Sequence, residues 1–316
     1  MSETVSAIVP TIGRPDALAA LFAALSTQPR RPDEVIVADG SDGDEVARVC
    51  EDPRWSRAGL RVRRVPVRPP HAVRQRQAAI ALATGSLLLL LDDDVVPEPG
   101  CVAAMMTEIA APGVVAITAD FSNQPWSGPT RLWRAYLKVV EGLADNAWQG
   151  QVVGPLLRFG YRPSPAQSMP MAWLGAGNSM VRRQAFEQAG GFSDFFLYRS
   201  TMNEDVDLGL KLGRVGRILL SPAARMAHHH APSGRVSAAT AAEDDLYNRY
   251  LILRRTLGRS APKAFGLVCV FLGVETLGNL GGSLWRGQRH GFVPRLVGRL
   301  KAVGRILLPF RREQGL

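Results

Sequence analysis

A run of five leucines that ends in three aspartates constrains the fold of this chain more than any other feature. The run covers residues 87–91, and Asp92, Asp93 and Asp94 follow it directly. Five leucines in a row leave no polar face, so at this length they predict a strand that is buried on both faces of a parallel sheet. Ligands of open sheets of this kind bind at the carboxyl ends of the strands, where the three aspartates lie.

The three aspartates predict a divalent cation at the end of this strand. Neighbouring carboxylates repel one another and resist removal from water, and a bound cation would offset both costs. Their hard oxygen atoms suit Mg²⁺ or Mn²⁺. A solvated acidic turn is the alternative, and it would explain three aspartates better if no other feature of the chain accompanied them.

The first hundred residues alternate between strands and helices. Strands are expected at residues 5–10, 33–39 and 60–67, and helices at residues 16–26 and 72–84, before the leucine strand. This order is typical of βαβ units with right-handed crossovers, and it predicts a Rossmann-like α/β fold with a mostly parallel central sheet flanked by helices. Asp39 ends the second strand and is expected at the same end of the sheet as the three aspartates, although such a residue alone would more often form a turn.

Three groups of polar residues follow in the second half of the chain. Asn178 lies in a glycine-rich turn before a strand, Glu204 and Asp205 begin a helix, and His228 follows a short strand expected at residues 217–222. Acidic residues at a helix N-terminus also serve as charged caps, and a histidine is more often structural than a ligand. Two further histidines after His228, in a domain rich in acidic strand ends, favour a metal ligand.

The C-terminal part of the chain is strongly basic. Residues 249–316 contain 13 Lys and Arg but 2 Asp and Glu, whereas the first 248 residues contain 25 basic and 26 acidic residues. We therefore expect a domain of residues 1–235 and a basic helical extension of residues 236–316. Such asymmetry indicates an anionic partner, either a membrane surface or nucleic acid.

Residues 291–310 interleave apolar and basic side chains, which is typical of a helix on a membrane surface. The apolar segment 265–274 is too short before Glu275 to predict a membrane span. Helices that pack back on the enzyme, or that pair between two chains, are the alternative. The sequence leaves open whether residues 264–284 insert into the membrane.

Taken in order, these segments resemble family 2 glycosyltransferases with the GT-A fold, over about residues 4–230. The resemblance includes three departures: Ala38 precedes a single Asp39 where the family often has two aspartates, Gln77 replaces the usual asparagine, and Ala79 replaces a frequent glycine. The segments that carry it are residues 7–11 with Arg14 and Pro15, residues 35–41, residues 76–85, residues 92–94 with Pro97, residues 177–192, and Glu204 and Asp205 with His228.

The resemblance implies an inverting, metal-dependent transfer of a sugar from a nucleoside diphosphate to a hydroxyl of a glycan or lipid-linked acceptor of the cell envelope. Asp205 would be the general base, and Glu204 would orient an acceptor group. The implied metal ligands for Mn²⁺ or Mg²⁺ are Asp92, Asp94 and His228. The implied nucleotide-sugar contacts are Pro10, Thr11, Arg14, Asp39, Arg76, Asp92 and Asp93, and the implied acceptor contacts are Trp173, Gly177 and Asn178.

The residues leave two other functions to consider. The first is a nucleotidyltransferase of related fold, which would need a basic triphosphate-binding loop near the first turn. Arg14 alone is weak evidence for such a loop. The second is a non-enzymatic protein that binds membranes or nucleic acid through its basic C-terminal part. That function would not explain why strands end in aspartates in the first 248 residues, whose net charge is close to zero. We expect no nucleic-acid partner, and we leave a homodimer open.

The expected location is the cytoplasm, at the inner face of the plasma membrane. The N-terminus has no basic segment followed by a long apolar run, so no signal peptide is expected. Three cysteines without metal-ligand spacing suit a reducing compartment. The donor sugar, its nucleotide base and the acceptor linkage do not follow from the sequence.

Overall fold

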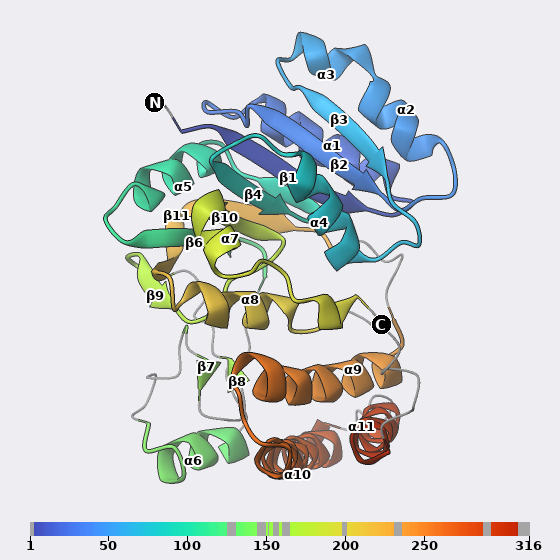
Figure 1. Ribbon diagram of the computed structural model, residues 1–316, viewed down its shortest axis with the longest axis vertical. Helices are drawn as coiled ribbons and strands as arrows, with labels where there is room; N and C mark the ends of the chain where they lie inside the picture. Colours follow the sequence, from blue (N-terminus) through green and yellow to red (C-terminus); the bar gives the residue numbers. More distant parts are fainter. Residues whose placement is uncertain are drawn as a thin grey trace. The chain divides into compact units, whose positions relative to one another are not determined.

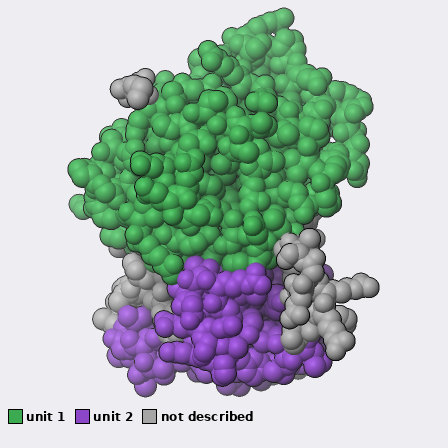
Figure 2. Space-filling view, viewed as in Figure 1, with its two compact units in different colours: residues 1–126, 162–197, 204–234 green, residues 127–161, 198–203, 235–316 purple. Residues whose placement is uncertain are grey.

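The computed structural model describes residues 3–124, 131–143, 150, 152–153, 158–159, 165–197, 201–230, 236–286 and 292–308. The chain divides into two compact units, which Figure 2 shows in different colours. Unit 1 comprises residues 1–126, 162–197 and 204–234, and unit 2 comprises residues 127–161, 198–203 and 235–316. The second unit thus contains, besides the expected C-terminal extension, two segments from the middle of the chain.

Unit 1 is organised around one large sheet (Figure 1). Its strands are β1 (Val5–Thr11), β2 (Glu34–Asp39), β3 (Val62–Pro66), β4 (Leu87–Leu91), β5 (Val95–Pro97), β6 (Val114–Phe121), β9 (Met169–Met171), β10 (Asn178–Arg182) and β11 (Arg217–His228). In the described residues their order is β3-β2-β1-β4-β10-β6-β11-β5, and β9 pairs with β11. The pairs among β3, β2, β1 and β4 are parallel, as is the pair β6–β11, whereas β10 is antiparallel to both neighbours. The predicted mostly parallel α/β sheet is confirmed.

The leucine strand lies at the centre of this sheet. β4 pairs with β1 on one side and β10 on the other, and all five of its leucines are fully buried. Burial on both faces is what an uninterrupted apolar strand requires. Because β1, β2 and β4 run parallel, Thr11, Asp39 and Asp92 follow one another at the same edge of the sheet.

Helices connect the strands of unit 1. They are α1 (Pro15–Ser26), α2 (Glu45–Glu51), α3 (Pro53–Arg57), α4 (Ala72–Leu82), α5 (Cys101–Ile109), α7 (Arg183–Gln188) and α8 (Glu204–Leu212), with a 3₁₀ turn η1 (Asp194–Phe196). α4 packs against β1 and β2, and α5 packs against β6 and β11. On α1, Leu18, Leu21, Phe22 and Leu25 are buried, as the spacing of its apolar residues predicts.

The strand that carries His228 is longer than the sequence predicts. We expected it to end at Pro222, but β11 continues from Arg217 to His228 across a change of register between Ser221 and Arg225. The Ser221 hydroxyl oxygen accepts a hydrogen bond from the Ala224 N–H at 3.1 Å, which satisfies a backbone donor inside the irregularity. Proline is tolerated at such a point because the ladder is already interrupted there.

Unit 2 is mainly helical, so the helical C-terminal extension is confirmed. Its elements are α6 (Arg131–Val139), the paired strands β7 (Val152–Val153) and β8 (Arg158–Phe159), α9 (Ala238–Leu251), the π-helical turn η2 (Ile252–Thr256), α10 (Ala261–Arg286) and α11 (Phe292–Leu307). α11 packs mainly along α9, and α10 contacts α6, α9 and α11. Parts of residues 120–170 and residues 198–200 lie outside the described residues.

Candidate active site

The carboxyl ends of β1, β2 and β4 carry the first part of the site. A side chain that the sequence analysis missed, Gln75 of α4, ties the first two ends together. Its amide nitrogen donates to the carbonyl oxygens of Thr11, at 2.8 Å, and of Ala38, at 2.7 Å. Gln75 is buried, so these bonds fix the separation of the strand ends in a place where water does not compete.

Asp93 joins the end of β4 to the loop after β1. Its carboxylate accepts hydrogen bonds from the Thr11 hydroxyl at 2.6 Å and from the Arg14 guanidinium at 2.9 Å. Burial raises the pKa of the Asp93 carboxyl, and the bonds from Thr11 and Arg14 act against that rise. The structure therefore brings together Thr11, Arg14 and Asp93, which are all expected to contact the donor. Asp93 is 3% exposed, so it positions the side chains of Thr11 and Arg14. Pro10, the fourth expected contact on this side, is buried at the end of β1.

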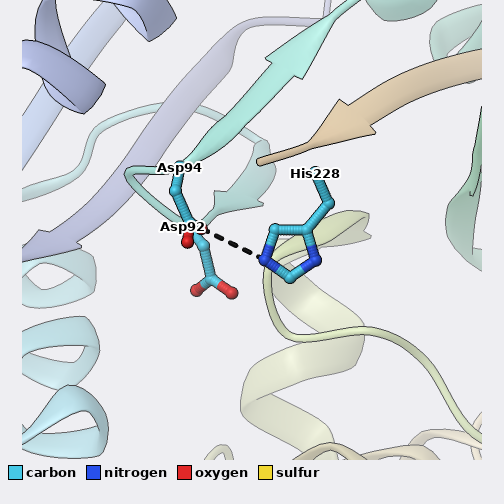
Figure 3. A group of neighbouring side chains, drawn as sticks. All are labelled: Asp92, Asp94 and His228. Carbon is cyan, nitrogen blue, oxygen red and sulfur yellow. Dashed lines mark ion pairs between the residues drawn. The ribbon is translucent and has the colours of Figure 1, made fainter. Parts of the chain in front are cut away.

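Asp92, Asp94 and His228 form a compact group (Figure 3). One ligand atom from each lies within 4.8 Å of the others, and His228 Nε2 is 3.2 Å from Asp94 Oδ1. The antiparallel pair β5–β11 places His228 opposite Val95, directly after the aspartates. Asn123 holds the strand end, since its Oδ1 accepts the His228 N–H at 2.8 Å.

This group has the composition of a divalent cation site. Two carboxylates and one imidazole supply oxygen and nitrogen ligands, and the Asp92 side chain is 37% exposed, so an ion can reach it from solvent. His228 Nδ1 is buried and makes no hydrogen bond within the described residues. The residues predicted as metal ligands are therefore adjacent and suitable for Mn²⁺ or Mg²⁺.

Arg76 connects this group to the acidic start of α8. Its guanidinium is 2.6 Å from Asp92 Oδ1 and 3.2 Å from Glu204 Oε1, and the side chain is buried. Phe192 covers it, with the ring centroid 5.9 Å from the guanidinium carbon. One buried cation thus balances two carboxylates from distant parts of the sequence.

Glu204 and Asp205 lie side by side at the N-terminus of α8. Burial raises the pKa of both carboxyls; the Asp205 charge raises that of Glu204 further, and Arg76 opposes both increases. Asp205 Oδ1 also accepts a hydrogen bond from the Val206 N–H at 2.8 Å, which favours its charged form. An aspartate with a raised pKa accepts a proton more readily, which is the property of a general base.

Both carboxylate oxygens of Asp39 are bound by neighbouring groups. Its Oδ2 is 2.9 Å from the Arg64 guanidinium, and its Oδ1 accepts the Ser41 N–H at 2.8 Å. Arg64 lies on the edge strand β3 and was missed in the sequence analysis, because in an alternating exposed strand an arginine has no distinguishing mark. The expected donor contact of Asp39 would therefore involve the carboxylate and guanidinium together.

The residues expected at the acceptor have structural contacts. Asn178 is buried and donates from Nδ2 to the Ala119 carbonyl at 2.6 Å, and Trp173 is buried where its backbone leaves no room for a side chain at Gly209. Gly177 accepts the Asp92 N–H through its carbonyl at 3.1 Å, and a Cβ at this position would clash with the Asp92 carboxylate. Gly177 thus lies directly against a candidate metal ligand, and the acceptor roles of Trp173, Gly177 and Asn178 stay predictions.

Comparison with known proteins gives a consistent result. The family model described as glycosyl transferase family 2 matches residues 6–190. The O-antigen biosynthesis protein RfbC of Myxococcus xanthus is 29% identical over 274 residues, which are 80% of this chain and 19% of that protein. The N-acetylglucosaminyl-diphospho-decaprenol L-rhamnosyltransferase of Mycobacterium tuberculosis is 44% identical over 66 residues, 20% of each chain. The matched regions thus span about a fifth of the length of these curated relatives.

A solved structure has a similar fold. The mannosyltransferase PcManGT of Pyrobaculum calidifontis, solved with GDP-Man and Mn²⁺, superposes with a TM-score of 0.56 at 16% identity. The match covers 98% of this chain and 88% of that protein. At this identity the likeness concerns the fold alone.

Proposed function

The chain belongs to glycosyl transferase family 2, and from this premise we propose that it transfers a sugar from a nucleoside diphosphate donor to an acceptor hydroxyl with inversion at the anomeric carbon. The predicted family and GT-A fold are confirmed. The observation that carries the proposal is the position of Asp92, Asp94 and His228 beside the Arg76–Glu204 pair, at the carboxyl ends of the strands.

The donor is proposed to bind across the ends of β1, β2 and β4. A Mn²⁺ ion held by Asp92, Asp94 and His228 would neutralise charge on the diphosphate leaving group. Mn²⁺ is favoured over Mg²⁺ because an imidazole belongs to the ligand set and because the similar mannosyltransferase was solved with Mn²⁺. Arg14 and the Asp39–Arg64 pair would then contact the nucleotide.

Asp205 is proposed as the general base. It would remove the proton of the acceptor hydroxyl as that oxygen attacks the sugar, and its raised pKa suits this task. Glu204, held by Arg76, would orient the acceptor. A single displacement with one base inverts the anomeric centre.

The acceptor is proposed to be a sugar linked through diphosphate to a polyprenol. This proposal is supported by the name of the mycobacterial relative, which describes such a lipid-linked acceptor, and by the basic character of the C-terminal part. The sugar that is transferred stays open.

The test is release of nucleoside diphosphate from UDP-, GDP-, dTDP- and CDP-sugars, with and without a polyprenyl-diphosphate-linked sugar. We expect Mn²⁺-dependent release from one donor class, accelerated by the lipid-linked acceptor. Asp205→Asn should lower the rate by about 10²-fold or more while donor affinity is retained, because proton transfer contributes this much. Glu187→Gln, at an exposed carboxylate of α7, is the control and should leave the rate unchanged. Undiminished turnover by Asp205→Asn would refute the assignment of the base.

A further inference from the structure

Exposed large apolar side chains are concentrated in unit 2. Among the described residues fourteen such side chains are exposed, and thirteen of them belong to unit 2, with Ile12 as the exception. Single exposed apolar residues are normal on any protein, but a concentration of this kind marks an interaction surface.

α11 has its apolar side turned outward. Gly298 and Ala302 are buried, and the Ala239 carbonyl of α9 lies so close to Gly298 that a Cβ there would clash. At 100° per residue, four exposed side chains lie on nearly the opposite side of the helix. These are Val293, Val297, Leu300 and Leu307, of which Val293 is 62% exposed. A helix that served only to cover a protein core would bury this row.

α10 shows the same orientation. Phe271 faces α9, because the Arg249 guanidinium lies 4.3 Å from the centre of its ring. On the side away from Phe271, Val270, Leu277 and Leu280 are exposed. Leu277, like Val293, is 62% exposed, so this row is not merely the edge of a buried contact.

The two apolar rows lie on neighbouring helices of unit 2. α10 and α11 both pack on α9 through residues that lie about 100° or more around the helix from the exposed rows, they also contact each other, and Figure 1 shows them next to each other. Glu275 of α10 fixes the pair, since it lies 3.6 Å from Arg299 of α11 and accepts the Trp133 indole N–H of α6 at 2.6 Å. We call the combined surface the outer face; it consists of Val270, Leu277, Leu280, Val293, Val297, Leu300 and Leu307.

The charges around the outer face are positive. Glu275 is the one acidic residue in the sequence of α10 and α11, and it is engaged by Arg299 and Trp133. Lys263 of α10 and Lys301 of α11 are exposed, and at 100° per residue they lie next to Val270 and Val297 around their helices. A second copy of the chain would bring two positive surfaces together, whereas anionic lipid complements both the charge and the apolar rows.

We propose that the outer face docks on the surface of a bilayer that contains anionic lipids, with α10 and α11 lying in the interface. α10 is long and apolar enough to cross a membrane by length and composition. Its contacts with α6, α9 and α11, and the ion pair of Glu275 with Arg299, favour an interfacial position over a transmembrane one. This docking is independent of the reaction proposed for unit 1.

The experiment is co-sedimentation of the full chain with vesicles of phosphatidylcholine, either alone or with about 30% phosphatidylglycerol. We expect binding to the anionic vesicles that weakens as salt is added. The double variant Lys263→Gln/Lys301→Gln should bind about 25-fold more weakly, at roughly fivefold for each charge. Val297→Ser/Leu300→Ser should lose about tenfold or more through lost apolar contact. The controls are Arg57→Gln, on α3, and Val236→Ser, before α9, both at exposed positions outside the outer face.

Other outcomes would overturn the proposal. Equal binding of the outer-face variants and the controls would exclude this surface. A wild-type dimer that Val297→Ser/Leu300→Ser converts to a monomer, with vesicle binding unchanged, would assign the face to a second copy. Retention in the membrane after an alkaline wash would show that α10 spans the bilayer. Circular dichroism of each variant separates these outcomes from unfolding.

Discussion

Arg76 is the residue on which the geometry of the site depends most. Its buried guanidinium contacts the candidate metal ligand Asp92 through one nitrogen and the Glu204 carboxylate through another. The family resemblance implied that Arg76 contacts the donor, but the sequence could not show that the residue links two segments 128 positions apart. Such a link depends on tertiary packing, which local sequence patterns do not encode.

The raised pKa of Asp205 leads to a prediction about the pH dependence of the rate. Because burial raises the pKa of Asp205, a larger fraction of this base is protonated, and inactive, at mildly acidic pH than for an ordinary aspartate. Replacing Arg76 with Gln removes the positive charge that opposes this increase, so the pKa of Asp205 should rise. The acid limb of the pH profile of donor cleavage should therefore move to higher pH in Arg76→Gln, and the maximal rate should fall. An unchanged or downward-shifted limb would contradict this interpretation, and Glu187→Gln is the control.

The close approach of Gly177 to Asp92 leads to a prediction about metal affinity. A Cβ at this position would overlap the Asp92 carboxylate, which is a movable side-chain end, so Gly177→Ala should displace that carboxylate and leave the fold intact. We expect Mn²⁺ affinity to fall by about 10- to 100-fold, the range found for changes next to metal ligands. Gly266→Ala is the matched control because a Cβ there meets open space. Titration of Mn²⁺ by electron paramagnetic resonance measures both, and equal affinities would show that Gly177 does not constrain Asp92.

Elements with a strong local pattern were predictable, and elements that depend on irregular pairing were not. β4 followed from its uninterrupted leucines, and α1 from the spacing of its apolar residues. β11 did not, because Pro222 normally ends a strand and the continuation to His228 depends on a register change that only the neighbouring strands create. His228 was identified from its sequence context, but its position beside Asp94 is a result of that longer strand.

The register change in β11 depends on the Ser221 hydroxyl, which leads to a prediction about stability. The buried Ser221 hydroxyl donates to Glu108 Oε1 at 2.6 Å while it accepts the Ala224 N–H. Ser221→Ala leaves both groups without this partner and should lower the free energy of unfolding by about 1–3 kcal/mol. It should also weaken Mn²⁺ binding by displacing His228.

Ser168→Ala is the control for Ser221→Ala. Ser168 donates to the other oxygen of Glu108, Oε2, at 2.8 Å, but it is exposed, so water can replace it. Urea denaturation of both variants measures the difference. Equal stability of the two variants would mean that the register change does not need the Ser221 hydroxyl.

At the scale of the whole molecule, the charge asymmetry of the sequence and the two units of the structure agree in part. The basic C-terminal residues form most of unit 2, as the change in composition near residue 249 suggests. Residues 127–161 and 198–203 also belong to unit 2, and nothing in their composition marks them as such. Trp133 shows why: its burial and its bond to Glu275 depend on a helix 142 residues later in the chain.

The proposed function depends on a metal ion that Asp92, Asp94 and His228 would hold and that would bind the nucleotide. The most direct measurement is calorimetric titration of UDP, GDP, dTDP and CDP into the wild-type protein and Asp94→Asn, with and without Mn²⁺. We expect that one nucleotide binds in the presence of Mn²⁺ and that its affinity falls strongly without Mn²⁺. Asp94→Asn should lose this binding, and Glu187→Gln should retain it. Nucleotide binding that is equally tight without metal, or unaffected by Asp94→Asn, would contradict this expectation.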